Sequence, residues 1–238
     1  MTIDIANKWA LVTGASRGVG QQIALGLAKK GVNLVLHSSS RQNQETTVNL
    51  VKGTGVTVNS VEGDLSNRDS ISSFIEQAKS LSGGIDILYN NAAIMTSHTP
   101  IFETPQTDYE KSFQVNVYAV IQICAYFAPR MVSRGWGRII NVSSGINDTP
   151  GLDAYSLTKA ALDKYTRDLA IELQGTDVLA NMLDPGWCRT DMGGKDAFND
   201  VTSVLPGALI PAMLGKQEPQ APKGKMFVAQ DYAGIKWE

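Results

Sequence analysis

The chain contains only two cysteines, Cys124 and Cys188, among its 238 residues. Neither has a partner at the spacing of a metal site, and two cysteines cannot form a disulfide framework. We therefore expect a protein of a reducing compartment, most simply the cytoplasm, without a bound metal.

Long hydrophobic runs and clusters of one charge are also missing. No stretch reaches about 18 apolar residues, the length that a membrane-spanning helix requires, and the N-terminal residues do not follow the pattern of a signal peptide. Lysine and arginine number 21 against 23 aspartate and glutamate, a net charge of -2, and no basic run carries interleaved aromatics. The sequence therefore predicts neither a membrane nor a nucleic-acid partner.

What the sequence does contain is a regular alternation of short apolar runs and longer segments with helical period. Strands are predicted at 9–14, 32–37, 56–64, 85–92, 137–144, 178–186 and 225–229, and helices at 19–30, 42–52, 68–81, 107–133 and 153–173. Asn67 is predicted to cap the helix that begins at 68. This order favours parallel strands joined by right-handed crossovers.

With 43% hydrophobic residues, the chain can bury one large core. Residues 1–238 are therefore predicted to form a single α/β domain, a doubly wound Rossmann-type sheet of about seven strands with helices on both faces in three layers. A small substrate-loop region is expected around 191–223. Such sheets bind their ligands beyond the carboxyl ends of the strands.

A glycine-rich loop, TGASRGVG at 13–20, joins the first predicted strand to the first helix. Side chains at Gly14, Gly18 and Gly20 would keep a pyrophosphate from the backbone, or the helix from the strand. The helix N-terminus then attracts the phosphates. Three glycines alone could be a plain tight turn, but their place between a strand and a helix predicts a dinucleotide site.

The second strand ends without the acidic residue that would hold the 2′,3′-diol of an adenosine ribose. The stretch LHSSSRQ at 36–42 instead offers Ser38 and Arg41, and Arg17 lies inside the glycine loop. Guanidinium and hydroxyl groups suit a 2′-phosphate, so the sequence predicts NADP(H) rather than NAD(H). The alternative is that Arg41 is only a solvated loop residue.

Four more motifs follow the glycine loop in order: NNAA at 90–93, NVSS at 141–144, YSLTK at 155–159 and PGWCRTDM at 185–192. With these motifs the chain resembles the short-chain dehydrogenase/reductase family over nearly its whole length, from Lys8 to at least Met192. PGWCRTDMGG and the C-terminal residues look most like its carbonyl-reductase branch, of the short-subunit type. The resemblance implies the fold described above and, commonly, a homodimer or homotetramer.

By this resemblance the catalytic residues are Asn116, Ser144, Tyr155 and Lys159. Tyr155 and Lys159 are four residues apart, so they share one face of a helix. A free tyrosine has a pKa of about 10, and we expect the ammonium, with the positive ring of an oxidised nicotinamide, to favour the phenolate. Ser144 would hold the substrate carbonyl, and Asn116 would anchor a water unless it only caps or kinks its helix.

The NVSS motif offers two candidates for the catalytic serine, Ser143 and Ser144. Ser144 matches the family's serine, but it lies only 11 positions before Tyr155, which is shorter than usual. The span from Asn116 to Tyr155 is short as well. A trimmed loop within GINDTPGLD explains both spans, and this favours Ser144.

The glycine loop and the resemblance together define the candidate cofactor residues. They are Gly14, Ser16, Arg17, Gly18, Val19, Gly20, Ser38, Arg41, Asp64, Leu65, Asn91, Ala92, Tyr155, Lys159, Pro185, Gly186, Cys188 and Thr190. Asp64 matches the residue that contacts the adenine, Asn91 the one that stabilises the central strand, and Thr190 the one at the nicotinamide end. Ala93 stands where a glycine is commoner in the family.

Candidate substrate residues flank the motifs and would line an apolar mouth. They are Ile94, Met95, Ile146, Trp187 and Met192, and each could instead belong to the core. The sequence thus predicts an NADPH-dependent reductase of a ketone or aldehyde. The alternatives are a non-catalytic NADP-binding regulatory protein, or a 3-oxoacyl-thioester or sugar reductase of the same family.

Overall fold

The computed structural model describes residues 2–96, 100–146, 149, 151–215 and 223–234. Its strands are β1 (Trp9–Thr13), β2 (Asn33–Ser38), β3 (Val58–Glu62), β4 (Ile87–Asn90), β5 (Gly137–Val142), β6 (Val178–Asp184) and β7 (Met226–Val228). Its α-helices are α1 (Gly18–Lys29), α2 (Glu45–Val51), α3 (Arg68–Ser82), α4 (Gln106–Phe113), α5 (Ala119–Arg134) and α6 (Asp153–Glu172). Short 3-10 helices are η1 (Arg41–Gln44), η3 (Val201–Val204), η4 (Gly207–Ala212) and η5 (Ala229–Tyr232).

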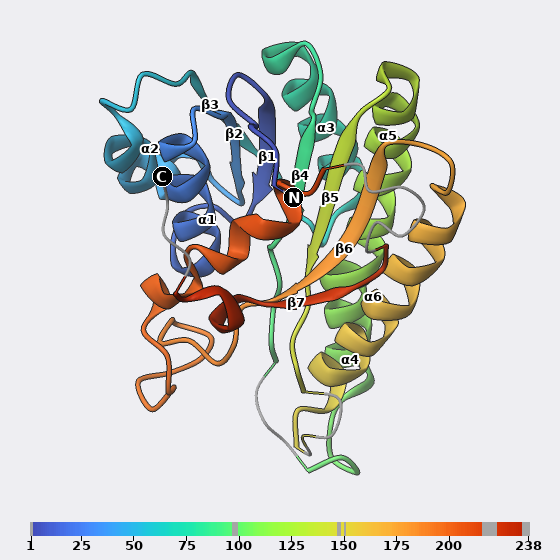
Figure 1. Ribbon diagram of the computed structural model, residues 1–238. Helices are drawn as coiled ribbons and strands as arrows, with labels where there is room; N and C mark the ends of the chain where they lie inside the picture. The colour runs from blue at the N-terminus through green and yellow to red at the C-terminus, as the bar shows by residue number, and fades with distance from the viewer. Residues whose placement is uncertain (1, 97–99, 147–148, 150, 216–222, 235–238) are drawn as a thin grey trace.

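The strands form one parallel sheet in the order β3-β2-β1-β4-β5-β6-β7. The direction in which strands are added reverses between β1 and β4. The loops that follow these two strands therefore diverge and leave a crevice at the carboxyl edge of the sheet. The doubly wound Rossmann-type fold predicted from the sequence is confirmed (Figure 1).

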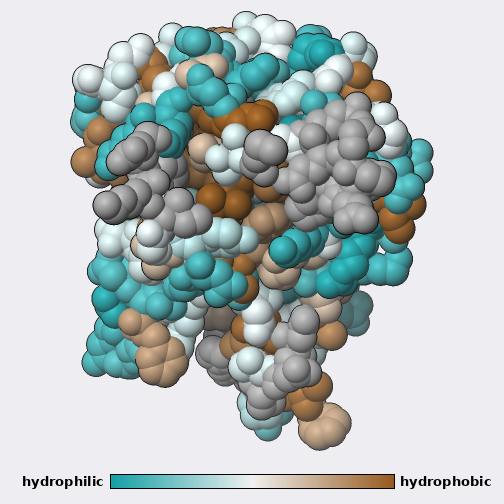
Figure 2. All heavy atoms as spheres, viewed as in Figure 1, coloured by the Kyte–Doolittle hydropathy of each residue, from teal (hydrophilic) through white to brown (hydrophobic). Residues whose placement is uncertain are grey.

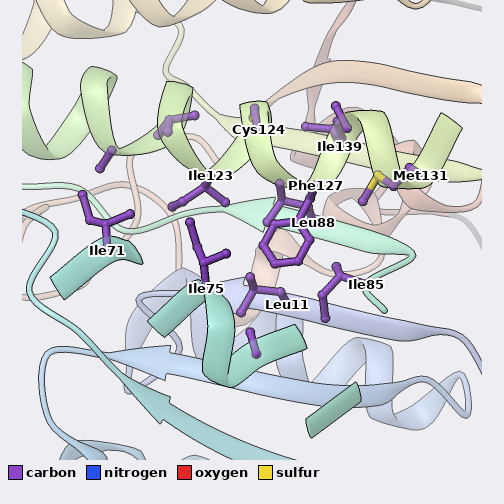
Figure 3. Close-up of a cluster of buried hydrophobic side chains, with 14 of the residues drawn as sticks. Leu11, Ile71, Ile75, Ile85, Leu88, Ile123, Cys124, Phe127, Met131 and Ile139 are labelled. Carbon is purple, nitrogen blue, oxygen red and sulfur yellow. The ribbon is translucent and has the colours of Figure 1, made fainter. Parts of the chain in front are cut away.

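Both faces of the sheet are covered, because alternate strand residues point to opposite sides. On one face, α3, α5 and α6 bury a cluster that includes Phe74, Ile123 and Phe127. Figure 3 shows Ile71 and Ile75 of α3 facing Ile123 and Phe127 of α5. On the other face, α1, α2, η3 and η4 bury a second cluster. The predicted three layers follow from these two cores.

The helix predicted at 107–133 contains a π-helical turn, η2 (Gln114–Tyr118), between α4 and α5. The whole run Gln106–Arg134 is long and apolar enough to cross a membrane by length and composition. However, Val120, Ile123, Phe127 and Met131 are buried against the sheet, which is the packing of a core helix. The face in Figure 2 carries apolar side chains only in separate patches among hydrophilic ones.

The remaining differences from the sequence prediction are local. The segment predicted as one helix at 42–52 is divided into η1 and α2. Asn67 caps α3 as predicted, because its side chain accepts a hydrogen bond from the Ser70 N–H at 3.0 Å. The expected substrate-loop region around 191–223 folds as turns followed by η3 and η4, and its residues 216–222 lie outside the described part of the chain.

Candidate functional site

A cavity of about 820 Å³ opens at the carboxyl edge of the sheet. Its walls come from the loops that follow β1, β2, β3, β4 and β6, from the end of β5, and from α6. Most of the sequence-predicted residues line it: Gly14, Ser16, Arg17, Gly18, Val19, Gly20, Ser38, Asp64, Leu65, Asn91, Ala92, Ile94, Tyr155, Lys159, Pro185, Thr190 and Met192. Residues of the glycine loop and of the NNAA, YSLTK and PGWCRTDM motifs thus meet in one place.

Other predicted residues do not line the cavity. They are Arg41, Met95, Asn116, Ser144, Ile146, Gly186, Trp187 and Cys188. Cys188 is buried as a free thiol. The Trp187 ring is half exposed, donates from Nε1 to the Gly193 carbonyl at 2.8 Å and meets Phe198 edge to face at 5.2 Å.

The glycine loop has the shape that a dinucleotide requires. Gly14 and Gly18 adopt φ values of 65° and 60°, which residues with a Cβ rarely adopt. A Cβ on Gly20 would overlap the Gly14 carbonyl oxygen and lie 2.5 Å from Nδ2 of Asn91. The same Asn91 amide donates to the carbonyls of Thr13 and Gly14, at 2.9 and 3.2 Å. The loop is therefore a rigid, open cradle of backbone at the N-terminus of α1, which fits a pyrophosphate.

At the end of the cavity near β2 and β3, the polar groups are Ser38, Ser39, Asn43 and Asp64. The backbone N–H and hydroxyl of Ser66 both donate to Asp64 at 2.8 Å, and they lower the pKa of this carboxyl. An ionised carboxylate there can accept hydrogen bonds from an amino group such as that of adenine.

The two arginines predicted to meet a 2′-phosphate occupy different positions. Arg17 lines the cavity, where its Nε lies 2.7 Å from the Asp191 carboxylate in an exposed ion pair. Arg41 turns away from the cavity, because its guanidinium donates to Gln77 at 2.9 Å. The Arg41 backbone N–H donates to Glu62 at 3.0 Å. Of the two, only Arg17 is in place to contact a ligand in the cavity.

Tyr155 and Lys159 stand on the cavity wall, one turn apart on α6. The Lys159 Nζ lies 5.3 Å from the centre of the Tyr155 ring and donates to the Val142 carbonyl at 2.7 Å. Burial lowers the pKa of Lys159 to about 8, against the attraction of Asp163. Burial, with a smaller contribution from the Asp184 carboxylate, raises the pKa of Tyr155 to about 12. In the protein alone, Lys159 therefore does not outweigh the burial of the phenol.

Asn116 lies in the π-helical turn, and its side chain is committed to protein groups. Its Nδ2 donates to the Ile94 carbonyl and to Thr158, while its Oδ1 accepts from the Ile94 N–H at 2.8 Å. Asn116 thereby holds the backbone that follows β4 against α6. A π turn inserted in a helix is common at functional sites.

The two candidate serines at the end of β5 differ in their contacts. Ser143 is buried, and its hydroxyl donates to the Asp163 carboxylate on α6. Ser144, the next residue, is half-buried. Ser143 lines the cavity, but its hydroxyl is already used inside the protein, whereas Ser144 does not line the cavity. Ser144 as the catalytic serine stays a prediction.

The family model described as short chain dehydrogenase matches residues 8–199. The chain belongs to the short-chain dehydrogenase/reductase family. It is therefore an oxidoreductase with a nicotinamide dinucleotide cofactor. In the described part of the chain, no group of three or more His, Cys, Asp or Glu side chains could hold a metal ion.

Similar proteins span almost the whole chain. A short-chain type dehydrogenase/reductase of Picea abies is 35% identical over 95% of this chain and 87% of its own length. The 3-oxoacyl-(acyl-carrier-protein) reductase FabG of Aquifex aeolicus is 35% identical over 81% and 78%. Among solved structures, a blue fluorescent protein from a metagenomic library, in complex with NADPH, has a TM-score of 0.83 at 26% identity over 98% of this chain and all of that one.

Several residues of this dehydrogenase/reductase cavity escaped the sequence analysis. They are His37, Ser39, Asn43, Gly63, Ser66, Lys111, Val115, Val142, Arg189, Asp191 and Val201. Those that end or follow a strand could have been found, since all parallel strands end at one edge of the sheet. Asn43, Lys111, Val115 and Val201 had no such signal, because they reach the cavity from helical segments that cross its rim.

Proposed function

We propose that this chain is an NADPH-dependent reductase of ketones or aldehydes, with Tyr155 as the general acid in reduction and the general base in the reverse reaction. The observation that carries this proposal is the meeting of Tyr155 and Lys159 with the glycine loop on one cavity. A cavity that only bound a dinucleotide would have no need of a phenol beside a buried amine.

The chain's own residues have defined tasks in this proposal. A bound nicotinamide supplies or accepts the hydride. The Tyr155 hydroxyl donates its proton to the carbonyl oxygen as negative charge develops there. Ser144 hydrogen-bonds the same oxygen. Lys159 binds the nicotinamide ribose, and its ammonium opposes the burial that raises the pKa of Tyr155.

The pKa of about 12 for Tyr155 in the protein alone has different consequences for the phenol as an acid and as a base. As an acid, a phenol with a raised pKa is held protonated, in the form needed to reduce a carbonyl. As a base in alcohol oxidation, it must lose that proton. The positive charge that favours the phenolate then has to come from Lys159 together with an oxidised nicotinamide. At neutral pH the phenol is therefore in the form that reduction requires.

The first test is a screen of ketones and aldehydes with NADPH, followed by loss of absorbance of the reduced cofactor. The panel includes a 3-oxoacyl thioester, because FabG of Aquifex aeolicus is 35% identical to this chain. We expect oxidation of NADPH with at least one small carbonyl compound. If NADPH binds and no carbonyl compound is reduced, the chain is a non-catalytic cofactor-binding protein.

The preference for NADPH over NADH is a second proposal, and it rests on Arg17. Replacing Arg17 with alanine removes a cationic donor from the cavity wall. Hydrogen bonds to charged groups contribute about 1.5–3 kcal/mol, so the Kd of NADPH should rise by about tenfold or more. The Kd of NADH should change little. Fluorescence titration measures both constants.

Arg68→Ala is the matched control, because Arg68 begins α3 and is absent from the cavity wall. It removes the same charge and should leave both constants unchanged. If the unchanged protein binds NADH and NADPH with equal affinity, the proposed preference for NADPH is wrong.

A homodimer or homotetramer also remains a proposal. It is supported by large apolar side chains that are exposed on the outer sides of α5 and α6, among them Val132, Leu157 and Ile171. A cytoplasmic location remains a prediction from the sequence.

A further inference from the structure

Two consecutive residues at the end of β5 are tied to two consecutive turns of α6. The Val142 carbonyl accepts a hydrogen bond from the Lys159 Nζ at 2.7 Å. The hydroxyl of the next residue, Ser143, donates to the carboxylate of Asp163. Lys159 and Asp163 are four residues apart, so they lie on the same face of the helix. These two contacts fix the place where the chain leaves the sheet and continues into Ser144.

Asp163 is unusual among the acidic residues of α6 because it is buried. Its side chain is 3% exposed, whereas that of Asp168 on the same helix is 56% exposed. Burial raises the pKa of Asp163, while the Ser143 hydroxyl and the charges of Arg167 and Lys159 lower it. A buried carboxylate is costly unless it is paired and hydrogen-bonded. We therefore expect Asp163 to have a role that offsets the cost of burying its carboxylate.

The residues around Asp163 form a stripe along one face of α6, with one member in each turn: Tyr155, Lys159, Asp163 and Arg167. Arg167 lies at the outer end, half exposed, with its guanidinium 4.0 Å from the Asp163 carboxylate. Tyr155 lies at the cavity end. Charge thus alternates from the surface to the phenol, and Asp163 is the one anion in the stripe.

We propose that Asp163 is a positioning residue for the reductase reaction, which keeps Lys159 an ammonium and, through Ser143, holds the backbone of Ser144 against α6. This inference rests on the proposed function, since it concerns the tasks given there to Lys159 and Ser144. Asp163 acts only through Lys159 and Ser143, because it does not line the cavity.

Other charged and titratable groups face the same region. On α6 they are Tyr155 and Arg167, and from the sheet side it is Asp184, at the end of β6. Asp184 accepts the Gly186 N–H at 2.8 Å and would be 2.5 Å from a Cβ on Gly145. Its negative charge raises the pKa of Tyr155 and of Asp163. Asp163 is the carboxylate whose attraction raises the pKa of Lys159 against burial.

The consequence for pH dependence has a definite sign. Lys159 has a pKa of about 8 while Asp163 is charged. Without that charge its pKa falls further, so the ammonium is lost at a lower pH. The part of the cofactor affinity that depends on the ammonium is therefore present below the lowered pKa of Lys159. It is lost as the pH rises above that pKa.

The test is the pH dependence of the Kd of NADPH, measured by fluorescence titration between pH 6 and 10 for Asp163→Asn. The variant keeps the shape of the side chain and removes its charge. We expect the alkaline loss of affinity to begin about one pH unit lower than in the unchanged protein. At a pH near 8, kcat for the carbonyl compound found in the screen should fall by about fivefold, as the ammonium fraction does.

Asp168→Asn is the matched control. Asp168 pairs at 2.6 Å with Lys164, four residues before it, which reproduces the spacing of Lys159 and Asp163 on the exposed side of the helix. This variant should retain the pH profile and kcat of the unchanged protein. If Asp163→Asn lowers the Tm but keeps the pH profile and kcat, Asp163 is only a structural residue and the inference is overturned.

A second variant keeps the inference testable if Asp163→Asn does not fold. Ser143→Ala breaks the contact between the end of β5 and Asp163 and keeps the charge of Asp163, so kcat should fall while the alkaline limb stays where it is in the unchanged protein. An unchanged kcat in Ser143→Ala contradicts the inference. Because the Kd of NADPH needs no substrate, the pH dependence measured for Asp163→Asn stands even if no carbonyl compound is reduced and the proposed function fails.

Discussion

Tyr155→Phe should abolish turnover and leave the Kd of NADPH within about twofold of the unchanged protein. The substitution removes only the hydroxyl, and the ring keeps its place on the cavity wall. General acid catalysis contributes roughly 10²–10⁴ in rate, so kcat should fall at least about 100-fold. Stopped-flow or steady-state loss of NADPH absorbance measures kcat, and fluorescence titration measures the Kd.

Tyr165→Phe is the matched control for this substitution. Tyr165 lies on the same helix, packs against the core beside Cys124 and is absent from the cavity wall. Its loss should lower stability slightly and preserve kcat. Retention of more than a few per cent of the rate by Tyr155→Phe would show that another group delivers the proton.

The pair of Tyr155 and Lys159 shows what a sequence can predict and what it cannot. Their spacing predicted a shared helix face, and both residues do line the cavity. The expected lowering of the phenol's pKa depends on desolvation and on Asp184, which is 29 residues away in the sequence. Burial by distant segments has no local signature, so only the folded protein reveals that it raises the pKa.

Contacts across the fold explain the other gaps. Arg41 follows β2 as predicted, but its guanidinium is drawn to Gln77 on α3. The Asn116 side chain holds the backbone of Ile94, 22 residues earlier, and the π turn that contains Asn116 was not predicted. The partner of Ser143 is 20 residues later, on α6. Motifs could therefore locate the cavity, while the tasks of residues beside it depend on packing.

For the glycine loop, the spacing of the glycines and their place between a strand and a helix were enough to predict a dinucleotide site, and this site lies on the cavity wall. The structure adds the reason: Gly20 packs against the carbonyl of Gly14 and against the Asn91 amide, and neither can yield easily. The Gly14 oxygen belongs to the backbone of the loop itself. The Asn91 amide is held by two carbonyls, those of Thr13 and Gly14.

Gly20→Ala should therefore abolish measurable cofactor binding, with the Kd of NADPH raised by at least about 100-fold. The added methyl overlaps the Gly14 carbonyl oxygen, so α1 must move away from the loop and its first amides leave the phosphate cradle. Alanine favours a helix over glycine by about 1 kcal/mol, so weaker binding would not reflect a weaker helix. Fluorescence titration with NADPH and with NADH measures the effect, which should be similar for both.

Gly26→Ala separates this effect from a general disturbance of α1. Gly26 lies on the same helix, and its added methyl would meet the ends of the Leu205 and Leu209 side chains, which can rotate away. Gly26 is also absent from the cavity wall. This variant should change the Tm and keep the Kd of NADPH. Were Gly20→Ala to bind NADPH as tightly as Gly26→Ala, the approach of helix to loop would not be what forms the phosphate site.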